Sequence, residues 1–73
     1  MRRRPIDSSV LLEVGYDPEF QVLEVELANR RVYRYFPVPE LVHRRLLRAP
    51  SAGRFFNAEI RDHYECERVD RHV

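Results

Sequence analysis

Two neighbouring segments of alternating side chains place the strongest limit on how this chain can fold. Residues 23–27 read Leu-Glu-Val-Glu-Leu, in which apolar side chains alternate with glutamates. This alternation is typical of a strand in an antiparallel sheet that has one dry face and one wet face. Residues 32–36 read Val-Tyr-Arg-Tyr-Phe, and β-branched and aromatic residues favour a strand there as well. We predict that the two segments form a β-hairpin.

The pairing parity of this hairpin decides which side chains share a face. With one parity, Arg34 lies on the dry face and both Tyr33 and Tyr35 lie on the wet face. With the other parity, the tyrosines lie on the dry face and Arg34 stands opposite a glutamate. A buried, unpaired Arg costs several kcal/mol, whereas a cross-strand ion pair stabilises by about 0.2–1 kcal/mol. We therefore predict the second parity, which leaves Arg34 and Phe36 on the outer face.

One further strand is predicted before the hairpin. Residues 10–16 alternate, so that every second side chain from Val10 onward shares one face and Leu11 lies on the other. Residues 17–19 read Asp-Pro-Glu, which is typical of a turn. The three predicted strands form an antiparallel meander.

Two helices are predicted after the meander. The first spans residues 39–49, beginning at a proline and ending before another. The second spans residues 51–62, with Ser51 as its cap. In that helix Phe56 and Ile60 point inward at i, i+4 spacing. The predicted fold is therefore α+β, a three-stranded antiparallel meander with a two-helix hairpin packed on one face.

Length and composition limit this chain to one small domain. It has 73 residues, and a chain of that size buries only about 60% of the surface that its unfolded form exposes. Its one cysteine, Cys66, rules out an intrachain disulfide, and no segment approaches the ~20 apolar residues of a membrane helix. We expect a single domain over residues 1–73, with a flexible basic arm over 1–6 and a flexible tail over 65–73. We expect it in the cytoplasm.

The charges are unevenly distributed, although the net charge is only +1. Residues 28–54 carry seven arginines and one glutamate, and the chain has no lysine. Arg suits phosphates because its guanidinium is a planar fork of donors, but a GC-rich genome also explains an excess of arginine. The pI of about 8.0 is below the ~9 that is usual for a nucleic-acid-binding domain. The candidate nucleic-acid or partner contacts are Arg30, Arg31, Arg34, Phe36, Arg44, Arg45, Arg48 and Arg54.

Several short blocks resemble the KTSC domain, a small family named for its occurrence at the C-terminus of some lysyl-tRNA synthetases. In order along residues 6–64, the blocks read Asp-Ser-Ser, Val-Gly-Tyr-Asp, Leu-Glu-Val-Glu, Val-Tyr-Arg-Tyr-Phe-Pro-Val-Pro, Gly-Arg-Phe-Phe-Asn and Ile-Arg-Asp. The resemblance implies a small bacterial or phage domain that often stands alone and has no established activity. It also implies an RNA-binding role, which has been suggested for the family. The family usually has glycines in the hairpin, where this chain has Arg30 and Arg31.

The aromatic residues of the second hairpin strand have two interpretations. With the predicted parity, Tyr33 and Tyr35 pack in the core and their hydroxyls reach polar partners. A base-stacking platform would require exposed rings, which that parity argues against. Phe36, on the outer face near Arg34, either contacts a partner or is covered by the helix entry or the N-terminal segment.

The last two blocks of the resemblance are predicted to be structural. Phe56 and Ile60 belong to the core, and Asn57, Arg61 and Asp62 form a polar network that locks the helix to the tail. The predicted structural motif therefore comprises Tyr33, Tyr35, Phe56, Asn57 and Ile60.

No catalytic or metal-binding motif stands out. His63, Cys66 and His72 lack the paired spacing of zinc ligands. Cys66 beside His63 lies in a charged segment with no predicted cavity, which is a poor setting for a nucleophile. We predict that the protein is not an enzyme and has no metal, cofactor or small-molecule substrate.

Two functional hypotheses follow from these patterns. In the first, the chain is a non-catalytic module that binds RNA or a nucleoprotein through the Arg-rich residues 28–54. In the second, it is a protein–protein interaction module of a bacterial or phage accessory protein, without nucleic-acid contact. That module would use the outer sheet face or the acidic residues 13–26. The expected partners are RNA or a nucleic-acid-processing protein, and no membrane.

Overall fold

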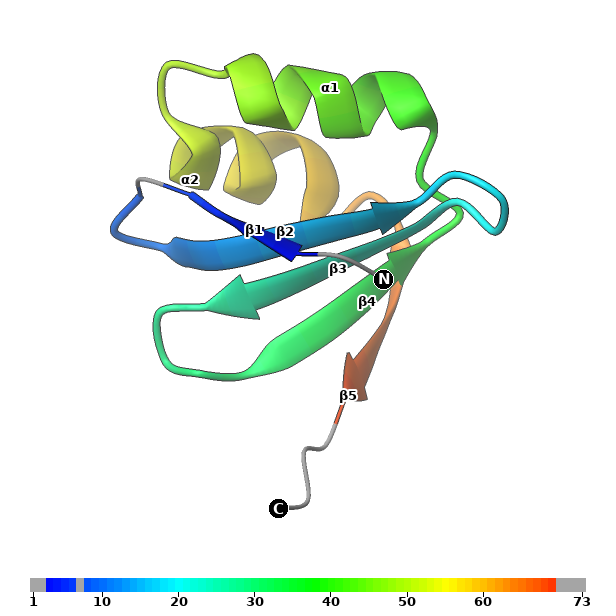
Figure 1. Cartoon of the computed structure of the whole chain (residues 1–73), viewed down its shortest axis with the longest axis horizontal. Coiled ribbons are helices and arrows are strands. Elements are labelled where there is room, and N and C mark those ends of the chain that lie inside the picture. Colours follow the sequence, from blue (N-terminus) through cyan, green and yellow to red (C-terminus); the bar gives the residue numbers. More distant parts are fainter. Residues whose placement is uncertain (1–2, 7, 70–73) are drawn as a thin grey trace.

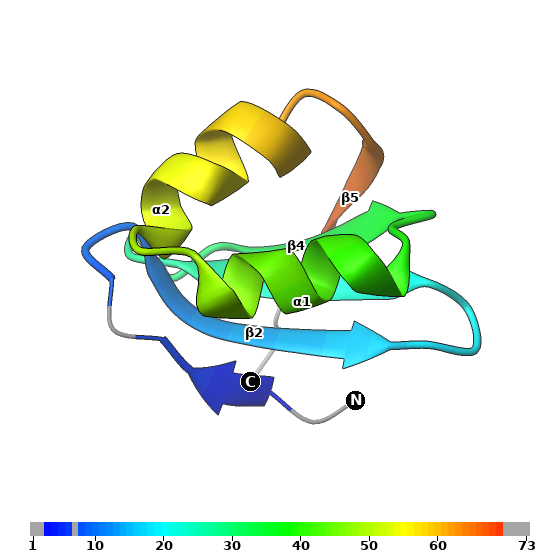
Figure 2. The same cartoon turned by 90° about the horizontal axis from the view of Figure 1, so that it is seen from above.

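The structure, a computed structural model, describes residues 3–6 and 8–69 and consists of one sheet with helices on one face (Figures 1 and 2). The sheet has five antiparallel strands in chain order, namely β1 (Arg3–Pro5), β2 (Leu11–Asp17), β3 (Val22–Leu27), β4 (Val32–Phe36) and β5 (Glu65–Val69). The helices are α1 (Glu40–Arg48) and α2 (Ala52–Phe55), and α2 continues into a π-helical turn, η1 (Phe56–Ile60). The α+β class is confirmed, but the prediction of three strands is wrong.

The two additional strands come from segments that we expected to lie outside the sheet. Residues 3–5 of the expected arm pair with β2, and residues 65–69 of the expected tail pair with β4. Both are edge strands rich in charged residues, so they lack the apolar alternation that identifies a half-buried strand. The remaining residues of the two segments, 1–2 and 70–73, lie outside the described residues, and the flexibility expected for both segments stays a prediction.

The predicted parity of the hairpin is confirmed. Glu24 pairs with Arg34 and Val25 pairs with Tyr33, so the tyrosines face the helices and Arg34 faces outward. The loop has no glycine, and Arg30 takes the left-handed conformation with φ of 72°. Asn29 supports this turn because its Oδ1 accepts a hydrogen bond from the backbone N–H of Arg31 at 2.9 Å.

The alternation predicted for β2 is interrupted by a β-bulge. The pairing shifts between Leu11 and Glu13, which pair with Leu27 and Glu26 respectively. The extra residue turns Leu11 to the dry face, where its side chain is fully buried. The prediction that Leu11 lies on the opposite face from Val14 is therefore wrong, because both side chains are in the core.

The helices form near their predicted bounds. Helix α1 carries Glu40 in its first turn and Arg45 and Arg48 in its last, an order that favours the helix dipole. Helix α2 begins after Ser51, whose Oγ accepts a hydrogen bond from the N–H of Arg54 at 3.3 Å, as the sequence predicts for a cap. No helix among residues 3–6 and 8–69 is long and apolar enough to cross a membrane.

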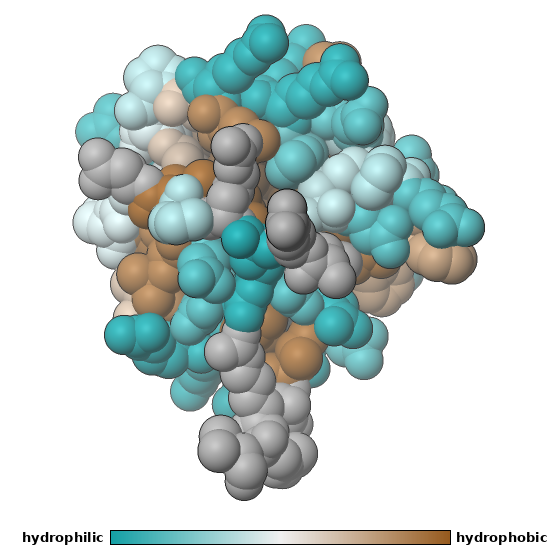
Figure 3. Space-filling model, viewed as in Figure 1, coloured by the Kyte–Doolittle hydropathy of each residue, from teal (hydrophilic) through white to brown (hydrophobic). Residues whose placement is uncertain are grey.

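The core lies between the helices and the inner face of the sheet. Its fully buried side chains include Phe56, Leu11, Leu23, Leu46 and Ile60. By contrast, hydrophilic side chains cover the top of the molecule, over α1 (Figure 3). This core fixes the position of η1 relative to the β3–β4 hairpin, and the candidate site lies between those two elements.

Candidate functional site

A cleft of about 640 Å³ opens on the helix-bearing face of the sheet. The β3–β4 hairpin forms one side of the cleft, and η1 and the residues after it form the other. Its lining residues are Ser9, Val10, Leu27, Ala28, Asn29, Arg31, Tyr33, Tyr35, Phe56, Asn57, Arg61, Asp62 and Cys66. Its volume lies within the ~300–1,000 Å³ that is usual for ligand sites.

Aromatic rings line the depth of the cleft. Tyr35 is only 4% exposed, and its ring meets the ring of Phe56 edge to face, with centroids 5.5 Å apart. Tyr33 lies two residues earlier on the same face of β4, where it is half-buried and packs against the core. The prediction of a buried tyrosine therefore holds for Tyr35. The ring of Tyr33 keeps accessible surface in the cleft.

The rim of the cleft carries polar side chains without internal partners. Among the described residues, the side chains of Arg31, Asn57, Arg61 and Asp62 make no hydrogen bond or ion pair. All four residues are exposed. The predicted network that locks the helix to the tail is therefore absent from the described residues, and these groups face solvent instead.

Charged groups at the rim of the cleft affect the pKa of the Tyr35 hydroxyl. Burial raises the pKa of Tyr35 from 10.0 to about 12, with further raising contributions from Cys66, Tyr33 and Asp62 and a lowering one from Arg61. The hydroxyl thus remains a neutral donor and acceptor near pH 7, within reach of the charges of Arg61 and Asp62.

This raised pKa predicts a loss of stability at high pH. Between about pH 10 and about pH 12 the unfolded chain has released the Tyr35 proton and the folded chain retains it, so the free energy of unfolding falls as pH rises. The loss reaches about 2–3 kcal/mol from this one group. Urea unfolding across that pH range measures it. Tyr35→Phe should show a shallower decline, and an unchanged slope in that variant would contradict the assignment.

A second, smaller hollow of about 340 Å³ adjoins the cleft and shares Ser9, Val10 and Asn57 with it. Arg54 also lines this hollow. The segment before β2 packs tightly here, since a Cβ on Gly53 would come within 2.9 Å of the Val10 side chain. We call the two adjoining hollows together the depression; its lining includes three arginines, at positions 31, 54 and 61.

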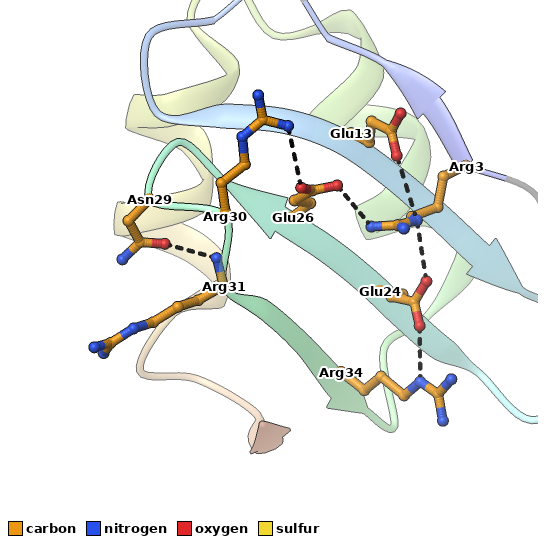
Figure 4. Close-up of polar contacts among 8 residues, drawn as sticks. All are labelled: Arg3, Glu13, Glu24, Glu26, Asn29, Arg30, Arg31 and Arg34. Carbon is orange, nitrogen blue, oxygen red and sulfur yellow. Dashed lines mark hydrogen bonds and ion pairs between the residues drawn. The ribbon is translucent and has the colours of Figure 1, made fainter. Parts of the chain in front are cut away.

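On the opposite face of the sheet, charged side chains form an outer-face ion cluster (Figure 4). Its centre is Arg3 of β1, whose guanidinium lies 3.3 Å from a carboxylate oxygen of Glu24 and 3.1 Å from one of Glu26. Glu24 also lies 2.9 Å from the guanidinium of Arg34, and Glu26 lies 3.8 Å from that of Arg30. The cluster comprises Arg3, Glu13, Glu24, Glu26, Arg30 and Arg34.

The predicted binding arginines therefore do not form one surface. Arg30 and Arg34 belong to the outer-face ion cluster, and Arg44 pairs with Glu40 at 3.1 Å on α1. Figure 4 shows the guanidinium of Arg31 directed away from the cluster. Among the described residues, the arginines that make no ion pair are Arg31, Arg45, Arg48, Arg54 and Arg61.

Phe36 lies on the outer face and is half-buried. It lines a hollow of about 380 Å³ with Phe20, Val22 and Arg34. Phe20, in the β2–β3 turn, is 68% exposed. Val32, on the same face of β4 as Arg34 and Phe36, is buried beside its cross-strand neighbours Glu26 and Val69.

The sequence predicted a structural network for Asn57, Arg61 and Asp62, and that prediction missed their position in the lining of the cleft. The available signal was their spacing relative to buried neighbours. Phe56 and Ile60 point into the core, so Asn57 and Arg61, each one residue later, project from a different side of the helix. Among the described residues, no group of three or more His, Cys, Asp or Glu side chains is placed to hold a metal ion. His72 lies outside those residues.

Comparisons of the sequence and of the structure with known proteins both find KTSC domains. The KTSC domain matches residues 7–64. An uncharacterized protein of Stutzerimonas stutzeri is 46% identical over 71 residues, which cover 96% of this chain and all of that protein. The crystal structure of a KTSC domain protein from Yersinia pestis superposes with a TM-score of 0.92 and 36% identity, covering 94% of this chain and 97% of that one.

A lysine–tRNA ligase of Nostoc punctiforme also matches. It is 35% identical over 63 residues, which are 86% of this chain but only 11% of the ligase. This similarity therefore concerns a small part of the enzyme.

Proposed function

The chain belongs to the KTSC domain family, and from this we propose that it is a non-catalytic module that binds RNA. The similarity to part of a lysine–tRNA ligase supports a role beside RNA. Because the match covers 11% of that enzyme, the ligase reaction itself is not carried over to this chain.

The observation that carries the proposal is the depression formed by the two hollows. Arg31, Arg54 and Arg61 line it, and none of them has an acidic partner among the described residues. A guanidinium that forms no internal ion pair is available to a phosphate, which it binds with parallel N–H donors. The half-buried ring of Tyr33 supplies the aromatic surface on which RNA-binding proteins stack bases.

Charge reversal of these three arginines tests the proposal. A labelled single-stranded RNA of about 12 nucleotides should bind in a fluorescence anisotropy titration, with an affinity that depends on salt. Three phosphate contacts predict a slope of log K against log salt of about −2, or a loss of about 20-fold between about 50 mM and about 200 mM salt. The variant with Arg31→Glu, Arg54→Glu and Arg61→Glu should lose at least about tenfold in affinity and most of that slope.

The matched control reverses three arginines on α1 instead, as Arg44→Glu, Arg45→Glu and Arg48→Glu. Both triple variants change the net charge equally, so a difference between them reports position. Retained binding in the α1 variant supports the depression as the RNA surface. Loss confined to the α1 variant would move the surface to that helix, and absence of wild-type binding at low salt would end the proposal.

A second candidate, protein binding on the outer face, is favoured by the exposed ring of Phe20 beside the hollow that contains Phe36. Such a partner would remain bound after nuclease treatment and would be lost on Phe36→Ala. A partner that is recovered only with intact nucleic acid would support RNA binding instead.

A further inference from the structure

We propose that the cleft between the β3–β4 hairpin and η1 takes a single unstacked guanine base of single-stranded RNA. This inference rests on the proposed RNA-binding function and names the part of the RNA that the cleft recognises. It follows from the shape of the cleft, the ring that lines it and the polar groups at its rim.

The concave shape favours a splayed-out base over a duplex. A volume of about 640 Å³ accommodates a nucleotide, and the hairpin and η1 form walls on two sides. A duplex presents a convex surface and keeps its bases stacked and paired, so a whole base cannot enter such a cleft. Sequence-specific RNA recognition accordingly targets loops and single strands, whose bases are free to leave the stack.

Tyr33 provides the stacking surface inside the cleft. It is half-buried and packs against the core, so its ring is held in place while part of it remains accessible. Tyr35, further along the same strand face, is fixed by its edge-to-face contact with Phe56. A base on Tyr33 would therefore lie next to a rigid floor and needs little reorganisation of the protein.

The rim carries donors and acceptors suited to guanine. The Asp62 carboxylate accepts hydrogen bonds, whereas the Asn57 amide donates them. On its Watson–Crick edge, guanine presents two adjacent donors, N1–H and the N2 amino group, which match the two oxygens of a carboxylate. Its O6 beside them accepts from an amide. Adenine, cytosine and uracil lack this pair of adjacent donors.

These rim groups are free to bind. The side chains of Asn57, Arg61 and Asp62 have no hydrogen-bond or ion-pair partner among the described residues, so a ligand does not have to break an internal contact. Asp62 also distinguishes this cleft from a simple phosphate site, because a carboxylate repels an anion. Asp62 and Asn57 therefore fit a base edge, and Arg31, Arg54 and Arg61 fit the phosphates of the backbone.

The test compares uridine-rich RNAs of about nine nucleotides that differ only in the central base, which is G, A, C or U. Wild type should bind the guanine RNA about tenfold more tightly than the others. Asp62→Asn should abolish this preference, because the amide replaces one acceptor by a donor, and should leave the salt slope unchanged. Glu59→Gln, an exposed glutamate of η1 outside the cleft lining, is the control and should keep the preference.

A mononucleotide titration gives a readout that does not depend on the RNA backbone. Amide resonances of residues 57 and 62 should shift with guanosine monophosphate, and less with inosine monophosphate, which lacks the N2 amino group. Equal binding of all four RNAs, or a guanine preference that survives Asp62→Asn, would overturn the inference and leave the RNA-binding proposal intact. Absence of binding to every RNA would overturn both.

Discussion

Phe56→Ala is expected to lower the free energy of unfolding by about 3–5 kcal/mol, the largest loss that we predict for a single substitution. Phe56 is 1% exposed and packs between the helices and the sheet, so truncation leaves a cavity that a small core cannot readily fill. It also removes the ring that contacts Tyr35 edge to face. Since small domains have only about 5–15 kcal/mol of stability, a large share of the variant should be unfolded at elevated temperature.

Urea denaturation followed by circular dichroism measures this loss as a lower midpoint. Phe20→Ala is the matched control, because the same residue type is there 68% exposed. It should change stability by no more than about 0.5 kcal/mol. Similar midpoints for the two variants would contradict the position of Phe56 in the core.

Arg3→Ala is expected to cost about 2–3 kcal/mol, far more than a typical surface ion pair. The side chain of Arg3 is 16% exposed, and those of Glu24 and Glu26 are 10% and 9% exposed. Removal of Arg3 leaves two mostly buried carboxylates with their remaining contacts to Arg34 and Arg30. These contacts offset part of the lost stability, so the cost stays below that of a buried carboxylate with no partner.

The control for Arg3 is Arg44→Ala. Arg44 and Glu40 form an i, i+4 pair whose side chains are 64% and 53% exposed, so its loss should cost no more than about 0.5 kcal/mol. Hydrogen exchange should also accelerate in β1 and β2 of the Arg3 variant, because Arg3 joins β1 to the centre of the sheet. Equal effects of the two substitutions would show that the outer-face ion cluster does not stabilise the fold.

The hairpin was predictable because its register follows from local costs. A buried, unpaired Arg34 would cost more than any compensation that the same strand offers, so the pairing with Glu24 follows from the two segments alone. The strands at residues 3–5 and 65–69 were not predictable in this way. Their charged side chains carry no strand pattern, and their place in the sheet depends on backbone hydrogen bonds to strands already positioned by the core.

The candidate site likewise combines features that the sequence predicted with features that only the fold decided. Composition drew attention to the arginines of residues 28–54, but Arg30, Arg34 and Arg44 pair with glutamates of the fold itself. The sequence spacing specifies two of these pairings, Arg34 with Glu24 across the hairpin and Arg44 with Glu40 at i, i+4 on a helix. It does not specify that Arg3 of β1 reaches the same glutamates, because that contact depends on distances across the sheet. It also placed Arg61 in a structural network, whereas the fold brings it beside the hairpin.

The sequence by itself determined the two-layer architecture, the hairpin register and the inward position of Phe56 and Ile60. Each of these depends on burying apolar side chains at a fixed spacing, which adjacent residues specify. Only the tertiary structure decided that Arg3 pairs with Glu26 on the outer face and that Arg31 and Arg61 line one cleft. Those relations join residues more than 20 positions apart, and they depend on how the packed core orients the strands and helices in space.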